Sequence, residues 1–311
     1  MIITNPPVAI TDNLLMLGTL DYPIFIVRDG GEAAVVEGGV GACGPVLEEQ
    51  LTKFGIARES VKQIVVTHGH PDHVMAVPAF RRMFPGAQVL ASQIAAATMA
   101  NEKAIGFFAK MDQALTAWLL GKGAITESQK PQALTEMKIS VDRVLKEGDT
   151  LTVGGLKFNV MATPGHSDCS LSFFEPARKI AIVADVTGFF MPATNSWWAM
   201  YFTDYGAYLN SNRRLAALGA EVVCLAHNAV ITGADEVKEY FQGAIAAAEA
   251  YHKRIVDAVK AGKDPRALAG ELGVEIHAQT GPLPVDFFQK NCSLLVKNSL
   301  KHEGISVEKP A

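Results

Sequence analysis

Short apolar segments recur along both halves of this 311-residue sequence, and four of them lead, directly or through a short loop, to a histidine or an aspartate. The four are Gln63–Thr67 before His68, Leu156–Met161 before His166, Ile180–Ala184 before Asp185, and Val222–Ala226 before His227. Runs of this length and composition are typical of buried strands. Since sites in α/β proteins lie at strand ends, the pattern predicts an α/β sandwich of two sheets with helices outside and chemistry at the strand ends.

The order of the predicted elements separates a strand-rich part from a helical part. Three short strands open the sequence, and Asp29-Gly30-Gly31 joins the second to the third as a β-hairpin turn. Residues 92–123 are rich in Ala, Met, Leu and Phe at helical spacing, which predicts a helical insertion over about 92–137. From residue 234 onward only helical patterns follow. We therefore expect a sandwich over residues 1–233 and a helical C-terminal cap over residues 234–311.

Charge and composition narrow the classes of partner. The net charge is −4 and Lys and Arg form no block, so neither nucleic acid nor an anionic membrane surface is expected as a partner. No apolar run approaches the ~20 residues that a membrane span needs. Residues 1–10 contain no Lys or Arg, unlike the start of a secretory signal. These features predict a cytoplasmic protein with a small-molecule substrate.

The segment His68-Gly69-His70-Pro71-Asp72-His73 places three imidazoles and a carboxylate within six residues. Alternation in an extended loop directs His68 and His70 to one side, whereas Asp72 and His73 turn onto the start of the next helix. Because the four side chains cannot all reach one ion, two adjacent metal ions are the natural solution. Imidazoles and carboxylates suit zinc, iron or manganese, and two ions ~3.5–4 Å apart can clamp an attacked carbonyl group. Further ligands are then needed from the other strand ends.

Together, the strand-end motifs resemble the metallo-β-lactamase fold superfamily, in its branch of glyoxalase II and lactonase-like hydrolases. The shared order is H-x-H-x-D-H, then Thr163-Pro164-Gly165-His166-Ser167, then an Asp after an apolar strand, then a final His, over residues 13 to about 233. The resemblance implies an αββα sandwich that holds two divalent metal ions. It assigns His68, His70 and His166 to the first ion, Asp72, His73 and His227 to the second, and Asp185 to the bridge between them.

A finer resemblance covers nearly the whole chain and concerns bacterial thioesterases of this superfamily with a helical C-terminal cap. It rests on Gly165-His166-Ser167-Asp168, on the insertion after Ser92 and on the closing Val285-Asp286-Phe287. The resemblance implies a metal-dependent hydrolase of an ester-like bond, above all an acyl thioester, with a metal-bridging hydroxide as nucleophile. Asp72 would then also act in catalysis, because a hydrogen bond from the hydroxide to its carboxylate would orient the nucleophile.

Three other functions stay open at the level of sequence. The chain could be a lactonase or glyoxalase II-like hydrolase, a mononuclear iron enzyme similar to the persulfide dioxygenases, or a ligand-binding regulatory module. The persulfide dioxygenases share this fold and motif set but use fewer of the seven ligands. All seven ligand positions are filled here, whereas a protein relieved of catalysis could lose ligands without cost.

Aromatic residues dominate the stretch that follows Asp185, and they allow two interpretations. They line an acyl pocket beside the metals, or they pack the helices onto the sandwich. A tyrosine hydroxyl there could also stabilise a developing oxyanion, and a serine in the last helix could face the metals. The candidate substrate-binding residues are Phe189, Trp197, Trp198, Tyr201, Tyr205 and Ser293.

The helix predicted over residues 236–260 has a face of small side chains. Ala244, Ala247 and Ala248 contribute to this face. It can pack closely against the sandwich or against a second copy of the chain. A homodimer is therefore a further expectation.

Overall fold

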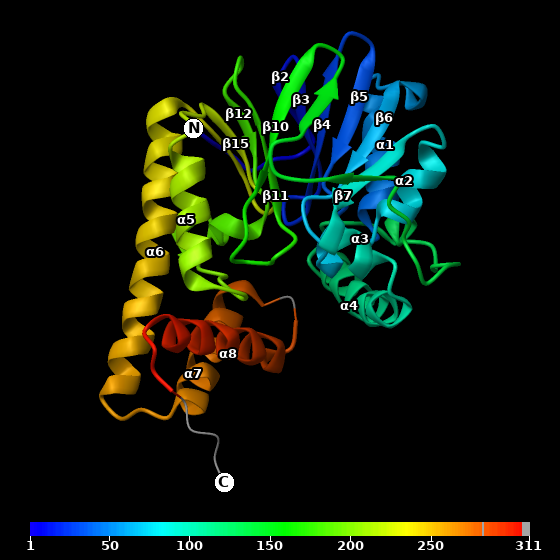
Figure 1. Ribbon diagram of the computed structural model, residues 1–311. Helices are drawn as coiled ribbons and strands as arrows, with labels where there is room; N and C mark the ends of the chain where they lie inside the picture. The colour runs from blue at the N-terminus through cyan, green and yellow to red at the C-terminus, as the bar shows by residue number, and fades with distance from the viewer. Residues whose placement is uncertain (282, 307–311) are drawn as a thin grey trace. The chain divides into compact units, whose positions relative to one another are not determined.

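The computed structural model describes residues 1–281 and 283–306, so residues 282 and 307–311 of the predicted cap lie outside the described residues. The chain forms two units (Figure 1). The sheet unit comprises residues 1–162, 169–184 and 219–237, and the helical unit comprises residues 163–168, 185–218 and the described residues after 237. Each unit is assembled from segments that are far apart in the sequence.

Within the described residues, the sheet unit contains two seven-stranded sheets, and in the first of them the strand order follows the chain. Its strands are β2 (Val8–Thr11), β3 (Leu14–Gly18), β4 (Pro23–Asp29), β5 (Glu32–Val36), β6 (Val61–Val65), β7 (Gln88–Ser92) and β8 (Arg143–Leu145). Neighbours from β2 to β5 are antiparallel, and those from β5 to β8 are parallel. Gly30 and Gly31, with φ of +56° and +84°, form the turn between β4 and β5 and confirm the predicted hairpin.

The second sheet brings the first residues of the chain next to a strand near residue 230. In spatial order it contains β1 (Ile2–Ile3), β16 (Val230–Thr232), β15 (Val222–Cys224), β12 (Ile180–Ile182), β11 (Leu171–Glu175), β10 (Leu156–Ala162) and β9 (Thr150–Val153). Only the pair β12 and β15 is parallel among these described strands. The sequence patterns predict neither β1, which has only two residues, nor β16, which follows His227 after a short loop.

The two sheets pack face to face through one apolar core, which confirms the predicted α/β sandwich. Leu14 of β3 and Phe158 of β10 belong to this core. Leu15 points to the opposite face of β3 and is equally buried, because helix α1 (Cys43–Lys53) packs against that strand. Burial on both faces explains why these strands appear as continuous apolar runs rather than as alternating ones.

The sheet unit also contains the predicted helical insertion. It follows α2 (Val77–Met83) and β7, and it consists of α3 (Gln93–Met99), α4 (Glu102–Gly121) and the 3-10 helix η3 (Glu127–Gln129). Helices α3 and α4 each begin at a capping side chain. Ser92 Oγ accepts a hydrogen bond from Ala95 N at the start of α3, and Asn101 Oδ1 accepts one from Lys103 N at the start of α4. Two further 3-10 helices, η1 (Arg58–Ser60) and η2 (Pro71–His73), lie in the loops on either side of β6.

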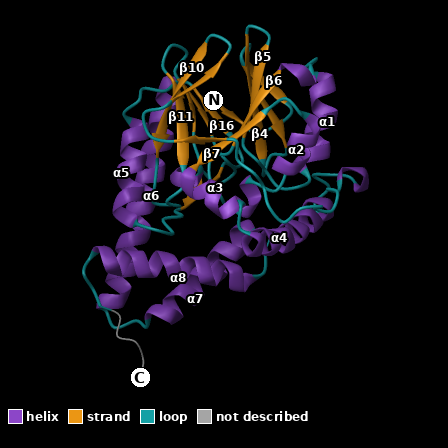
Figure 2. Cartoon of the chain, turned by 45° about the vertical axis from the view of Figure 1, so that its right-hand side comes forward, coloured by secondary structure: helices purple, strands orange, loops and turns teal. Residues whose placement is uncertain are grey.

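The helical unit holds the predicted C-terminal helices. Its elements are η4 (Asp185–Thr187), the hairpin of β13 (Phe189–Met191) and β14 (Ser196–Trp198), α5 (Tyr205–Ala216), most of α6 (Ala234–Lys260), α7 (Pro265–Thr280) and α8 (Val285–His302). Helices α7 and α8 lie side by side (Figure 2), and a Cβ atom on Gly273 would lie only 2.5 Å from Gln289 Cα. Among the described residues, no helix has both the length and the apolar character needed to cross a bilayer.

Asp112 fixes the insertion helix α4 to the loop that precedes α1. Its Oδ1 accepts a hydrogen bond from Gly41 N at 2.6 Å, and the residue is only 7% exposed. Burial disfavours the charged carboxylate and raises the pKa of Asp112 to about 6, although the hydrogen bond from Gly41 acts in the opposite direction. The folded chain therefore holds a proton at Asp112 more tightly than the unfolded chain does.

We expect this proton to make the free energy of unfolding depend on pH. The stabilisation from protonated Asp112 is fully present below the ordinary carboxyl pKa and is lost as the pH rises through about 6. Asp112→Asn keeps an acceptor for Gly41 but cannot ionise. The free energy of unfolding of the variant minus that of the wild type should therefore rise by roughly 2–3 kcal/mol between pH 4 and pH 7. Urea unfolding across this range measures the difference, and a difference that stays flat would contradict the assignment.

Candidate metal centre

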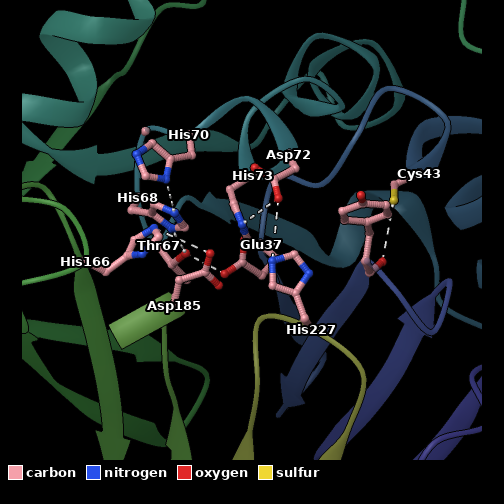
Figure 3. A network of polar contacts seen from close by, with 12 residues as sticks. Glu37, Cys43, Thr67, His68, His70, Asp72, His73, His166, Asp185 and His227 are labelled. Carbon is pink, nitrogen blue, oxygen red and sulfur yellow. Dashed lines mark hydrogen bonds and ion pairs between the residues drawn. The ribbon is translucent and has the colours of Figure 1, made fainter. Parts of the chain in front are cut away.

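The sheet unit brings five of the seven predicted ligands together (Figure 3). His68 and His70 lie in the loop after β6, whereas Asp72 and His73 belong to η2, as the sequence predicts. His227 lies in the loop between β15 and β16. Sequence positions more than 150 residues apart therefore meet in one cluster because β6 and β15 belong to the two sheets that pack together.

The carboxylate of Asp72 lies between two imidazoles. Its Oδ2 is 3.4 Å from His73 Nε2 and 3.5 Å from His227 Nε2, and the candidate ligand atoms of the three residues all lie within 4.8 Å of one another. His68 Nε2 lies 3.1 Å from His70 Nδ1, and the rings of His68 and His73 are 4.1 Å apart. Clusters of imidazole nitrogens and carboxylate oxygens at this spacing are compatible with a divalent metal ion.

Hydrogen bonds on the far side of the rings select which nitrogen faces the cluster. His73 Nδ1 lies 2.9 Å from Glu37 Oε2, and His227 Nδ1 lies 2.7 Å from the carbonyl oxygen of Asp21. Both acceptors require a proton on Nδ1, so each Nε2 keeps its lone pair for a metal ion. A ligating histidine in proteins is usually held in this way.

Glu37 contacts the candidate ligand His73, and the sequence motifs do not identify it. Its carboxylate is buried and accepts a hydrogen bond from Thr67 Oγ1 as well as the bond from His73. The backbone of Glu37 has a φ of +87°, which is rare for a residue with a side chain and indicates local strain. A charged residue directly after the apolar strand β5 and before Gly38 is the one signal in the sequence that could have pointed to it.

The helical unit holds the other two predicted ligands, His166 and Asp185. Both are buried, and His166 Nε2 lies 3.5 Å from Asp185 Oδ2. His166 Nδ1 lies 3.0 Å from the carbonyl oxygen of Met200, so this ring too turns its Nε2 toward a carboxylate. Asp185 is the first residue of η4. The helical unit therefore orients its own imidazole by the same device as the sheet unit.

The candidate substrate-binding aromatic residues contribute to the packing of the helical unit. Trp197 contacts Phe190 and Tyr240 at ring distances of 4.7 and 5.7 Å. Trp198 lies 5.6 Å from the ring of Phe288 in α8. These contacts belong to the packing interpretation of the aromatic stretch, while a role of Phe189, Trp197 and Trp198 in substrate binding stays a prediction.

The candidate hydroxyl groups have partners of their own in the helical unit. Tyr201 Oη lies 2.9 Å from Ser299 Oγ, and burial raises the pKa of Tyr201 well above its usual value, so the phenol stays protonated. Tyr205 stacks on His252 at 3.9 Å. Ser293 is exposed on α8, where its Oγ donates to the carbonyl oxygen of Gln289 at 2.9 Å. Oxyanion or substrate binding by these three residues likewise stays a prediction.

Comparison with known families and sequences gives a consistent result. The family model described as the metallo-beta-lactamase superfamily matches residues 18–227. Hydroxyacylglutathione hydrolase GloC of Haemophilus influenzae is 24% identical over 187 residues, which are 58% of this chain and 69% of that protein. A hydroxyacylglutathione hydrolase of Stenotrophomonas maltophilia is 39% identical over 71 residues, but these are only 23% of this chain and 25% of that protein.

Solved structures show the same fold. A metallo-beta-lactamase family protein from Thermus thermophilus superposes with a TM-score of 0.63 over 95% of each chain, at 22% sequence identity. A subclass B3 metallo-beta-lactamase of Bradyrhizobium japonicum superposes with a TM-score of 0.57 over 84% of this chain and 97% of that one, at 17% identity. At these identities the similarity concerns the fold.

We expect Glu37 to control metal affinity through His73. Glu37→Gln removes the negative charge and leaves one amide oxygen for two donors, so His73 should lose its fixed orientation. Loss of such an orienting carboxylate typically lowers metal affinity by roughly 10- to 100-fold. Zinc titration against a chelator of known affinity measures the change. Glu59→Gln, in an exposed position on η1, is the matched control and should bind zinc as the wild type does. Equal affinities in both variants would contradict the role of Glu37.

Proposed function

Because the chain belongs to the metallo-β-lactamase superfamily, we propose that it is a hydrolase that uses two divalent metal ions, zinc, iron or manganese, to cleave an acyl thioester. One observation carries the metal dependence. Three buried imidazoles, those of His73, His166 and His227, each have Nδ1 at hydrogen-bonding distance from an oxygen and Nε2 within 3.5 Å of a carboxylate oxygen. The Nδ1 contact fixes each ring so that its Nε2 and a carboxylate oxygen could be ligands of one metal ion.

The proposed ligand assignment uses all seven side chains. In the assignment that the sequence resemblance implies, His68, His70 and His166 would hold the first ion, Asp72, His73 and His227 would hold the second, and Asp185 would be a ligand of both. The mutual distances of Asp72, His73 and His227 within the sheet unit support the second set. The 3.5 Å between His166 and Asp185 within the helical unit supports a shared ion for that pair.

The metal ions, when bound, would lower the pKa of a water molecule and polarise the attacked carbonyl group. The protein contributes position and proton transfer. Asp72 is the least buried of the ligand carboxylates, with 25% of its side chain exposed, whereas the side chain of Asp185 is 6% exposed. A water molecule can therefore reach Asp72, whose carboxylate would accept a hydrogen bond or a proton from the water and orient its oxygen toward the carbonyl carbon.

The substrate class rests on the relatives and on the sequence resemblance. Two relatives are named as hydrolases of hydroxyacylglutathione, an acyl conjugate of a thiol compound. The finer resemblance described above, which spans the helical cap, is to the quinolone signal response thioesterase. An activated acyl–sulfur bond needs no acid to expel its leaving group, because a thiolate leaves readily near neutral pH. The proposed mechanism therefore needs Asp72 as a proton acceptor but needs no separate general acid.

We expect two equivalents of metal on protein purified without added metal or chelator, together with hydrolysis of acyl thioesters. Elemental analysis gives the metal content, and a dithiol reagent reports thiol release on the same sample. p-Nitrophenyl esters and lactones serve as comparison substrates, since turnover of these alone would move the assignment to an esterase or lactonase. One equivalent of iron, with oxygen uptake and no hydrolysis, would point to the mononuclear iron enzyme similar to the persulfide dioxygenases. Protein that cannot bind metal would contradict the proposal.

Substitution of a ligand tests the same mechanism. Asp185→Asn and His70→Ala should each reduce thioester hydrolysis to below roughly 1% of the wild-type kcat, because each removes a donor to a metal ion. Circular dichroism should show an unchanged fold. His277→Ala, which changes a histidine on α7 that is not a proposed ligand, should retain full activity. Activity that survived both ligand substitutions would be incompatible with the proposed centre.

A further inference from the structure

One face of α5 contacts both segments that carry the metal-ligand candidates of the helical unit. Ser211 Oγ donates a hydrogen bond to the carbonyl oxygen of Pro164 at 2.8 Å, two residues before His166. One helical position later, Asn212 Nδ2 donates to the carbonyl oxygen of Val186 at 2.6 Å, directly after Asp185. A single turn of helix therefore holds the backbone next to both ligands.

Tyr208 fills the space between the same two segments. A Cβ atom on Gly165 would lie 2.3 Å from Tyr208 N, so the loop before His166 approaches the backbone of α5 as closely as a glycine permits. A Cβ atom on Gly188, at the end of the turn that Asp185 begins, would lie 2.9 Å from Tyr208 Oη. The side chain of Tyr208 is fully buried. The two ligand segments thus pack against Tyr208 and also accept hydrogen bonds from Ser211 and Asn212 on the same helix.

The face of α5 that contacts the two ligand segments is polar although it is buried. Ser211 is 1% exposed and Asn212 is not exposed at all, and burying a hydroxyl or an amide costs free energy unless it is hydrogen-bonded. Apolar side chains would pack a helix at lower cost. Asn212 Nδ2 also donates to Tyr208 O at 3.0 Å, so the amide group is held in one orientation. A buried pair of donors aimed at two loop carbonyls is an arrangement that fixes loops rather than one that merely fills volume.

The start of α5 fixes the His166 segment from a second direction. The carbonyl oxygen of Gly165 accepts hydrogen bonds from Thr203 N at 3.0 Å and from Asp204 N at 3.3 Å. Asp204 is the N-cap of α5, and its Oδ1 accepts from Ala207 N. The segment that carries His166 is therefore attached to the N-cap of α5 and the residue before it and, through Ser211, to the second turn of the helix.

We propose that α5 is a positioning element that sets the separation of His166 and Asp185, with Ser211 and Asn212 as the positioning residues. The proposal rests on the proposed function, in which these two ligands share a metal ion. Ligands of one ion must be held to within ~0.5 Å, which mobile loops do not achieve without such support. Neither residue touches the metal or the substrate, so both act through the backbone of the ligand segments.

A matched pair of substitutions at Ser211 separates the effect of the hydroxyl donor from the effect of side-chain shape. Ser211→Thr keeps the donor, whereas Ser211→Val has nearly the shape of the threonine variant and no donor. We expect Ser211→Val and Asn212→Leu each to weaken zinc binding by roughly 10- to 100-fold, the size of effect seen when a ligand loses its support. Ser211→Thr should retain affinity close to that of the wild type. Affinity is measured on the full chain by competition with a chelator, and the visible absorption of the cobalt-substituted protein reports the ligand geometry.

Leu215→Ala controls for general loosening of α5. Leu215 is buried on the same helix, so its truncation destabilises the helix while leaving both donors in place. It should lower the thermal midpoint without changing zinc affinity or the cobalt spectrum. If zinc affinity instead follows stability across all variants, or if Ser211→Val and Asn212→Leu bind zinc like the wild type, the positioning role is wrong and the proposed hydrolase still stands. A wild-type chain that binds no metal would overturn both.

Discussion

Burying several ionisable side chains together is costly unless each is paired or bound to a metal, and the site of this protein is organised around that constraint. His68, His73 and His166 are almost fully buried, as is Asp185. The hydrogen bonds described for His73, His166 and His227 occupy Nδ1 with an oxygen acceptor. The Nε2 atoms are left to face carboxylates. Within each unit, a divalent cation bound between an imidazole Nε2 and a carboxylate would be attracted to the carboxylate and would accept the imidazole lone pair. Binding of the cation would then offset the free-energy cost of burying these groups.

The sandwich supplies the rigidity that such a site requires. Strands β6 and β15 lie in different sheets, and the apolar core between the sheets fixes the loops that follow them. Leu14 and Phe158 illustrate the division of roles, since they are buried in that core and carry no chemistry. The strained backbone at Glu37 is tolerated in this setting because its carboxylate binds Thr67 and His73.

The sequence predicts the strands, the sandwich and the ligand candidates because these features are local or compositionally rare. Three histidines and an aspartate within six residues leave few structural interpretations, and the predicted turn of Asp72 and His73 onto a helix is confirmed by η2. Glu37 could not be assigned in the same way. Its partner His73 lies 36 residues further along the chain, and no periodicity connects the two positions. Metal binding by the seven candidates as a set is a prediction of the sequence analysis.

Helix α5 shows a second reason why a sequence hides functional residues. Ser211 and Asn212 have the polar side chains that amphipathic patterning assigns to the solvent face of a helix. Both are buried, because the loop carbonyls of Pro164 and Val186 give them partners. The sheet unit and the helical unit therefore each orient their own ligands through contacts within the unit: Glu37 and the Asp21 carbonyl in one, the Met200 carbonyl and α5 in the other. In both units the residues that shape the donor set are one hydrogen bond away from the ligand side chains or their backbone, where a motif search that looks only for ligand residue types does not reach.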